Sequence, residues 1–260
     1  MAQDLERLTV QLSADIKSYE NAMKKAVGVT NARAREIEKR YQSMNASVTG
    51  AFGRATTAGV AALGGALSVR EVARYADAWT AAKNSLAVAG VVGAEQVAIL
   101  DQLYNSAQRN STPIGALADL YGKAAMSAKE LGASQSDLVK FADGIALSLR
   151  VSGKSAQEAS GALQQLGQLL GSSRVQAEEF NSIVDGAPTI MIAAANGIEK
   201  AGGSVSKLKQ LVNAGEISNR EYFNGVLAGL PVIERMAANT EQSIGQAFVK
   251  INNAITRYIG

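Results

Sequence analysis

The sequence predicts an all-α fold, and three observations support this prediction. Apolar residues recur at three- and four-residue spacing through most of the chain, which is the period of an amphipathic helix. A serine with an acidic residue three positions later precedes several of these segments, as in a helix-capping box. Glycine follows many of them, and proline occurs only three times in 260 residues. We therefore expect a long N-terminal helix followed by an array of short helices punctuated by glycine.

Residues 1–50 predict a long amphipathic helix with the narrow apolar stripe of a coiled coil. Residues 7–13 also fit a short strand, because Leu8, Val10 and Leu12 alternate with polar residues. The stripe either folds back onto the domain that follows or contacts a partner, such as a second copy of this chain. Its large side chains are our candidate contact residues, namely Tyr19, Met23, Tyr41 and Met44.

Residues 51–69 are rich in glycine and alanine, and residues 55–69 carry no charge. Insertion into a membrane is one interpretation, but a spanning helix needs roughly 20 apolar residues. Gly59, Gly64 and Gly65 also weaken a helix in water. We favour a flexible hinge or a packed helix of small residues, and weak membrane activity stays open as the alternative.

Residues 70–230 predict a domain of short helices. Thr112 is expected to cap a helix with Pro113 in its first position, and that helix is expected to continue through Leu131 to a stop at Gly132. Ser134 with Asp137 starts the next helix, which is expected to run to Gly153. A helix from Ser204 is expected to end at Gly215, and Ser218 with Glu221 forms a further capping box. Residues 231–260 predict one last helix, which begins after Pro231 and whose apolar stripe still repeats at Gly260, so we expect it to continue in a longer chain.

The segment from Ser155 to Pro188 predicts two helices separated by a Gly-Ser-Ser joint. Ser155 and Glu158 form a capping box, and Gly171 is expected to end the first helix in the left-handed conformation. The second helix is expected to stop at Gly186. Its two halves carry, in order, Ala162, Leu163, Gln165, Leu166 and Gln168, and then Glu178, Glu179, Asn181, Ile183, Asp185 and Pro188.

The composition excludes several classes of chemistry. The chain has no cysteine and no histidine, so it cannot build a Ser-His-Asp triad, a cysteine nucleophile or an ordinary zinc site. Its acidic start lacks the basic region of an export signal. The net charge is +3, and the basic patch of Arg33, Arg35, Lys39 and Arg40 is interleaved with Glu36 and Glu38, as on a solvated helix face. We therefore expect no specific nucleic-acid binding.

The order of residues in the Ser155–Pro188 segment resembles the core of the amino-terminal domain of tailed-bacteriophage tape-measure proteins. Further parts of the resemblance are residues 70–86, 112–132, 138–160 and 208–218, so that it covers roughly residues 70–230. This chain departs from the pattern at Gln176 and Ala177, where many relatives have a glycine before the acidic pair, and at Asp185, where a glutamate is more usual. Both changes keep charge or small size.

The resemblance implies a structural tail protein that sets the length of the tail tube during assembly and leaves the tube at infection. It implies a place in the virion, in the lumen of the tail, after assembly in the host cytoplasm. The implied partners are further copies of the chain, with three strands suggested, the tail-tube protein and a tail assembly chaperone, with transient host-membrane contact left open. The motif also nominates contact residues, namely Gln165, Glu179, Asn181, Asp185 and Pro188.

The sequence leaves two other functions as alternatives. A peptidoglycan hydrolase would need two carboxyl groups at a fixed separation, but Glu178 and Glu179 are adjacent on a helix and point about 100° apart. A helical DNA-binding or adaptor protein is the second alternative. Its candidate helix-turn-helix pairs are residues 166–183 and 208–226, and the second helix of each carries no more than one or two basic groups, too few for a specific DNA reader. We predict no enzyme activity, no metal site and no cofactor, and nominate no catalytic residues.

Overall fold

Helices make up all the regular structure of the described part of the chain. The computed structural model describes residues 69–260 except 173 and 241–242, and within these residues it has eleven α-helices, one short 3-10 helix and no strand. The helices are α3 (Val69–Val88), α4 (Gly93–Asn110), α5 (Ile114–Met126), α6 (Ala128–Leu131), α7 (Gln135–Val151), α8 (Ala156–Gly171), α9 (Ala177–Gly186), α10 (Pro188–Gly197), η1 (Glu199–Ala201), α11 (Val205–Asn213), α12 (Asn219–Ala237) and α13 (Ile244–Ile259). The all-α prediction is confirmed for this part.

The predictions made for the first 68 residues lie outside the described residues. They are the long amphipathic helix, the alternative strand at residues 7–13 and most of the uncharged segment 51–69. The candidate contact residues Tyr19, Met23, Tyr41 and Met44 lie outside them as well.

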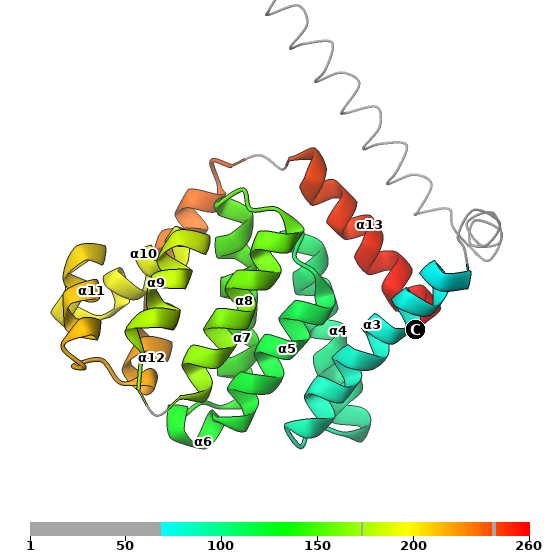
Figure 1. Ribbon diagram of the computed structural model, residues 1–260, viewed down its shortest axis with the longest axis horizontal. Coiled ribbons are helices and arrows are strands. Elements are labelled where there is room, and N and C mark those ends of the chain that lie inside the picture. Colours follow the sequence, from blue (N-terminus) through cyan, green and yellow to red (C-terminus); the bar gives the residue numbers. More distant parts are fainter. Residues whose placement is uncertain (1–68, 173, 241–242) are drawn as a thin grey trace, which may run out of the picture. The chain divides into compact units, whose positions relative to one another are not determined.

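The helices of the unit from Leu67 to Gly260 pack as a row of neighbours. Figure 1 shows α5, α7 and α8 in the middle of this unit, α9 to α12 on one side, and α3, α4 and α13 on the other. The packed pairs agree with this order, because α5 contacts α3, α7 and α8, while α12 contacts α7 and α10. The Ser155–Pro188 segment, which forms α8 and α9, therefore lies within the row of packed helices.

One continuous apolar core runs through these helices from Trp79 to Ile233. Aromatic side chains hold its middle, where the rings of Phe141 on α7 and Phe223 on α12 stack with their centroids 4.6 Å apart. At the α10–α12 crossing the backbones come much closer, because glycines replace side chains there. A Cβ atom added to Gly197 would lie 1.8 Å from the Gly225 carbonyl oxygen, and one added to Gly229 would lie 1.9 Å from the Ala193 carbonyl oxygen. Only glycine fits these positions.

Several predicted helix ends are confirmed. Ser134 with Asp137 and Ser155 with Glu158 form complete capping boxes at the starts of α7 and α8. Gly132 and Gly215, at which we expected helices to end, lie just after α6 and α11 and adopt the left-handed conformation, with φ of 66° and 72°. These signals need only a few neighbouring residues, which is why the sequence predicts them well.

The two helices of the Ser155–Pro188 segment end at Gly171 and Gly186 as predicted, but the left-handed conformation expected at Gly171 is wrong. Gly171 and Gly186 are the last helical residues of α8 and α9, and neither has a positive φ. After α8 the chain continues in extended conformation through Ser172, and the Asn219 side chain donates hydrogen bonds to the carbonyl oxygens of Leu169 and Ser172. Asn219 thus provides hydrogen bonds to carbonyl groups at the end of α8, which the amides after a left-handed glycine would otherwise have provided. After α9, Pro188 keeps Ala187 out of the helical region.

The predicted helix from Pro231 to the end of the chain is also wrong. Pro231 lies inside α12, which runs on to Ala237, and α13 starts separately at Ile244 behind a Ser243–Gln246 capping box. A proline inside a helix costs about 3 kcal/mol. Pro231 is exposed, while Leu230 and Ile233 on either side of it are buried in the core, so that packing holds the helix through the proline.

Three further local predictions need correction. Pro113 is the N-cap of α5 and not its first helical residue, and Thr112 does not cap it. The helix expected to reach Leu131 is divided at Ser127 into α5 and α6. The Ser218 hydroxyl does accept the Glu221 amide, but the Glu221 carboxylate lies 3.2 Å from the Lys200 ammonium instead of completing the capping box.

Candidate functional site

The Ser155–Pro188 segment folds as two helices with a joint between them, as predicted. Its first helix, α8, begins at the Ser155–Glu158 box, where the Glu158 carboxylate accepts the Ser155 hydroxyl at 2.7 Å and the Ser155 amide at 3.0 Å. These hydrogen bonds, with Lys154 nearby, lower the pKa of Glu158 to about 2. One face of α8 is apolar and buried. It includes Leu163, Leu166, Leu169 and Leu170.

The second helix of the segment, α9, is fixed by two fully buried side chains, Phe180 and Ile183. The Phe180 ring meets the Tyr222 ring of α12 edge-on, with the centroids 6.4 Å apart. Burial raises the pKa of Tyr222, whose hydroxyl lies 4.0 Å from the Met191 sulfur on α10. Packing among α8, α9, α10 and α12 therefore accounts for the apolar residues of the motif that face the core.

The five motif residues that we nominated for partner contact occupy different environments. Asp185 and Pro188 are exposed, whereas Gln165, Glu179 and Asn181 are half-buried. The Glu179 Oε2 and Asn181 Oδ1 atoms are buried and have no hydrogen-bond partner within the described residues. Contact of these five residues with a partner stays a prediction.

The acidic pair Glu178–Glu179 lies in the first turn of α9. Negative charge is favoured there by about 0.3–1 kcal/mol, because the amide groups of the first turn point toward it. Glu178 is exposed and Glu179 is half-buried, as expected for adjacent residues on different sides of a helix. The pair therefore lies where its negative charge favours the start of α9.

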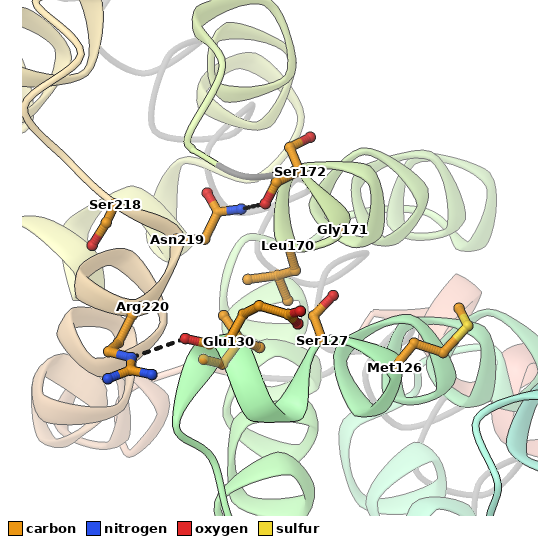
Figure 2. A pocket seen from close by; sticks show the side chains of 10 residues that line it. Met126, Ser127, Glu130, Leu170, Gly171, Ser172, Ser218, Asn219 and Arg220 are labelled. Atoms are coloured by element: carbon orange, nitrogen blue, oxygen red, sulfur yellow. Dashed lines mark hydrogen bonds between the residues drawn. The ribbon is translucent and has the colours of Figure 1, made fainter.

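A cleft opens beside the joint of the segment, between the end of α8, the short α6 and the start of α12. It has a volume of about 630 Å³. Figure 2 shows Asn219 and Arg220 on one side of it, Ser172 beside Asn219, and Glu130 and Ser127 across from them. The Arg220 guanidinium donates from Nε to the Glu130 carbonyl oxygen at 2.9 Å and also reaches that of Lys129 at 3.3 Å. Arg220 thereby joins the start of α12 to the end of α6.

Our sequence analysis did not single out Asn219 and Arg220. Both follow Ser218, whose capping role we predicted, and both are polar residues in the first turn of a helix. That position is a signal of a helix start, but it does not reveal which other helix the side chain reaches. Asn219 bonds to residues about fifty positions earlier and Arg220 to residues about ninety positions earlier.

The described residues offer no group of three or more acidic side chains that could hold a metal ion. In the same part of the chain, no helix is both long and apolar enough to cross a membrane. The segment 55–69, for which membrane contact was left open, is not covered by this finding because nearly all of it precedes the described residues.

The fold and the site define an all-helical protein. In it the Ser155–Pro188 segment is held in place by buried side chains and by the capping box at its start. A protein-family model described as tape measure protein matches residues 70–260. The match covers well over half of the chain, and the chain therefore belongs to the tape measure protein family. This family is structural rather than catalytic, and it places the chain among the components of the phage tail. The comparisons with curated proteins and with solved structures returned no match.

Proposed function

We propose that this chain sets the length of a phage tail tube during assembly and leaves the tube at infection. The observation that supports the proposal most strongly is the family match over residues 70–260, together with the resemblance of the Ser155–Pro188 segment. In this function the chain lies in the lumen of the tail after assembly in the host cytoplasm. Its partners are the tail-tube protein, a tail assembly chaperone and other copies of itself, with transient host-membrane contact through residues 55–69.

We further propose that the two parts of the chain contribute differently. A length-determining element has to be extended, and a helix gains about 1.5 Å per residue. The described helices are at most 20 residues long and fold back on one another around one core. We therefore assign assembly to this unit, and a contribution to length to the predicted N-terminal helix of residues 1–50.

Tail length measured by electron microscopy tests this division. We would delete 28 residues in frame from the gene, once within residues 16–48 and once within residues 155–215. The first deletion is expected to shorten tails by about 40 Å, at 1.5 Å per residue. The second is expected to abolish tails, because it removes the buried leucines of α8 or the core residues of α9 and α10.

The matched control is the wild-type gene supplied from a plasmid, which should restore both tail number and length. Full-length tails with normal infectivity from both deletions would refute the proposed function. Shortened tails from the second deletion would refute the assignment of assembly to the folded unit, and leave the length-determining role intact.

A further inference from the structure

Helix α13 packs beside the apolar core of its domain and not within it. The core is a continuous cluster of buried apolar residues from Trp79 to Ile233, and it includes none of the α13 residues whose side chains the structure describes. Within that described set Val249 is the buried apolar residue, and it lies outside the cluster. The other buried side chains of α13 are polar, namely Gln246, Asn253 and Thr256. The buried side of α13 is therefore mainly polar.

Two of these polar side chains attach α13 to backbone groups of other helices. The Gln246 amide donates to the Arg150 carbonyl oxygen at the end of α7 at 3.0 Å. The Asn253 amide nitrogen donates to the Thr112 carbonyl oxygen at 2.7 Å, and its amide oxygen accepts the Ile114 amide at 3.0 Å. Ile114 is the first residue of α5, so that a side chain 139 positions away provides the cap that we had expected from Thr112. Docking of α13 is thereby coupled to the start of α5.

The end of α13 covers Trp79, the single tryptophan of the chain. Trp79 lies on α3 and is 8% exposed. Gly260 lies so close to it that a Cβ atom built on this glycine would overlap the Trp79 side chain. The Lys83 ammonium lies 5.9 Å from the centre of the Trp79 ring and donates to the Gly260 carbonyl oxygen at 3.5 Å. Figure 1 shows α13 along the edge of the described unit, with its last turn beside α3. Trp79 therefore reports whether α13 is docked.

Polar contacts of this kind stabilise a docked helix less than apolar burial does. A hydrogen bond contributes little net free energy, because both groups bond to water once the helix has left. An exposed ion pair, such as Arg257 with Asp101 at 2.7 Å, contributes less still. The core helices are held differently, since Phe141 of α7 and Phe223 of α12 are fully buried. Because local opening costs least where apolar contacts are few, α13 should open at a lower free energy than α7 and α12.

We propose that α13 is a releasable strap, which leaves the domain as one unit while the core from α3 to α12 stays folded. Its release uncovers Trp79 and frees the Thr112 carbonyl and the Ile114 amide at the start of α5. The strap is 16 residues long, and an isolated helix of that length is marginal in water, so that it loses helical structure once released. This segment can then lengthen while the core stays buried. The proposal concerns the docking of α13 and holds whether or not the chain determines tail length.

A urea titration of the whole chain tests the proposal, with Trp79 emission and far-UV circular dichroism recorded on the same samples. The emission should shift to the red at a lower urea concentration than the one at which most of the circular dichroism is lost, because release of α13 exposes the ring first. Gln246→Ala removes the bond to Arg150 and should raise the equilibrium constant for release about fivefold, so that the emission transition moves to lower urea. The main circular dichroism midpoint should stay in place. The matched control is Asn196→Ala, which removes an exposed bond within α10 and should leave the emission transition unchanged.

Amide hydrogen exchange followed by NMR gives a second test at the level of single residues. The Ile114 amide donates to Asn253, so that its protection depends on docked α13. It should exchange as fast as the amides of α13 and about tenfold or more faster than the Phe223 amide of α12. Coincident emission and circular dichroism transitions in the wild type, or an Ile114 amide as slow as that of Phe223, would overturn the proposal, since α13 would then unfold only with the core. An emission transition that Gln246→Ala does not move would overturn it as well, because Trp79 would then report a different motion.

Discussion

The α10–α12 crossing allows a sharp test of how this domain is held together. We consider Gly229→Ala, which adds one methyl group to α12. That methyl carbon would lie 1.9 Å from the Ala193 carbonyl oxygen and 2.6 Å from its carbonyl carbon. Real side chains almost never come closer than 3.0 Å, and these atoms belong to the backbone of α10, which cannot rotate away. The two helices would therefore have to separate by about 1 Å or more.

The change in the free energy of unfolding caused by Gly229→Ala follows from two opposing effects. Alanine is favoured over glycine in a helix interior by about 1 kcal/mol, which would stabilise the variant. Overpacking a well-packed contact costs typically 1–3 kcal/mol, and separating the helices also loosens neighbouring core contacts. Because the clash here is with backbone, we expect the overpacking to dominate and the free energy of unfolding to fall by about 2 kcal/mol. This corresponds to a decrease of roughly 4–8 °C in Tm for a domain of this size.

Urea denaturation followed by circular dichroism measures this change. The matched control is Gly161→Ala in the middle of α8, where a new methyl group would meet no atom within 4 Å. There only the helix preference acts, so that this variant should gain about 0.5–1 kcal/mol. If Gly229→Ala were as stable as the wild type while Gly161→Ala gained stability, the close backbone contact between α10 and α12 would be refuted.

Three further predictions concern polar contacts. Asn253→Ala leaves the buried Ile114 amide and Thr112 carbonyl without partners and should lower the free energy of unfolding by about 2–4 kcal/mol. Asn252→Ala removes only an exposed hydrogen bond to Tyr75 and should lower it by under about 1 kcal/mol. Urea denaturation of both variants measures the difference. Because the folded-state pKa of Glu158 is lowered to about 2, its contribution to stability is present above its ordinary pKa of 4.5 and lost as the pH falls toward 2; Glu158→Gln should flatten this part of the Tm–pH curve. Arg220→Lys should speed hydrogen exchange in α6 and leave α3 unchanged, because lysine cannot reproduce the two bonds to carbonyl oxygens of α6.

The fold class and many helix starts could be predicted because their signals are local. The capping boxes at Ser134 and Ser155 need only four consecutive residues, and the left-handed glycines at 132 and 215 need only the end of one helix. The Ser243–Gln246 box belongs to the same class of signal, and we missed it because we expected one uninterrupted helix after Pro231.

The remaining features depend on residues that are distant in the sequence. The cap of α5 comes from Asn253 on α13, and the end of α8 is satisfied by Asn219 on α12. Local sequence around Thr112 or Gly171 holds no trace of these partners. The cleft of the candidate site has the same origin, since it is formed where α6, α8 and α12 meet. Helix propensity also misleads at Pro231, where burial of Leu230 and Ile233 outweighs the local penalty.

These long-range contacts bear on how the chain can serve as a tape measure. Residues 69–260 would span about 290 Å as a single helix, at 1.5 Å per residue. They instead form one core in which α10 and α12 touch backbone to backbone, and in which α13 is attached by buried polar side chains. Extending this unit would expose that core and leave Asn253, Thr112 and Ile114 without their partners. A folded unit of this kind suits a fixed attachment point.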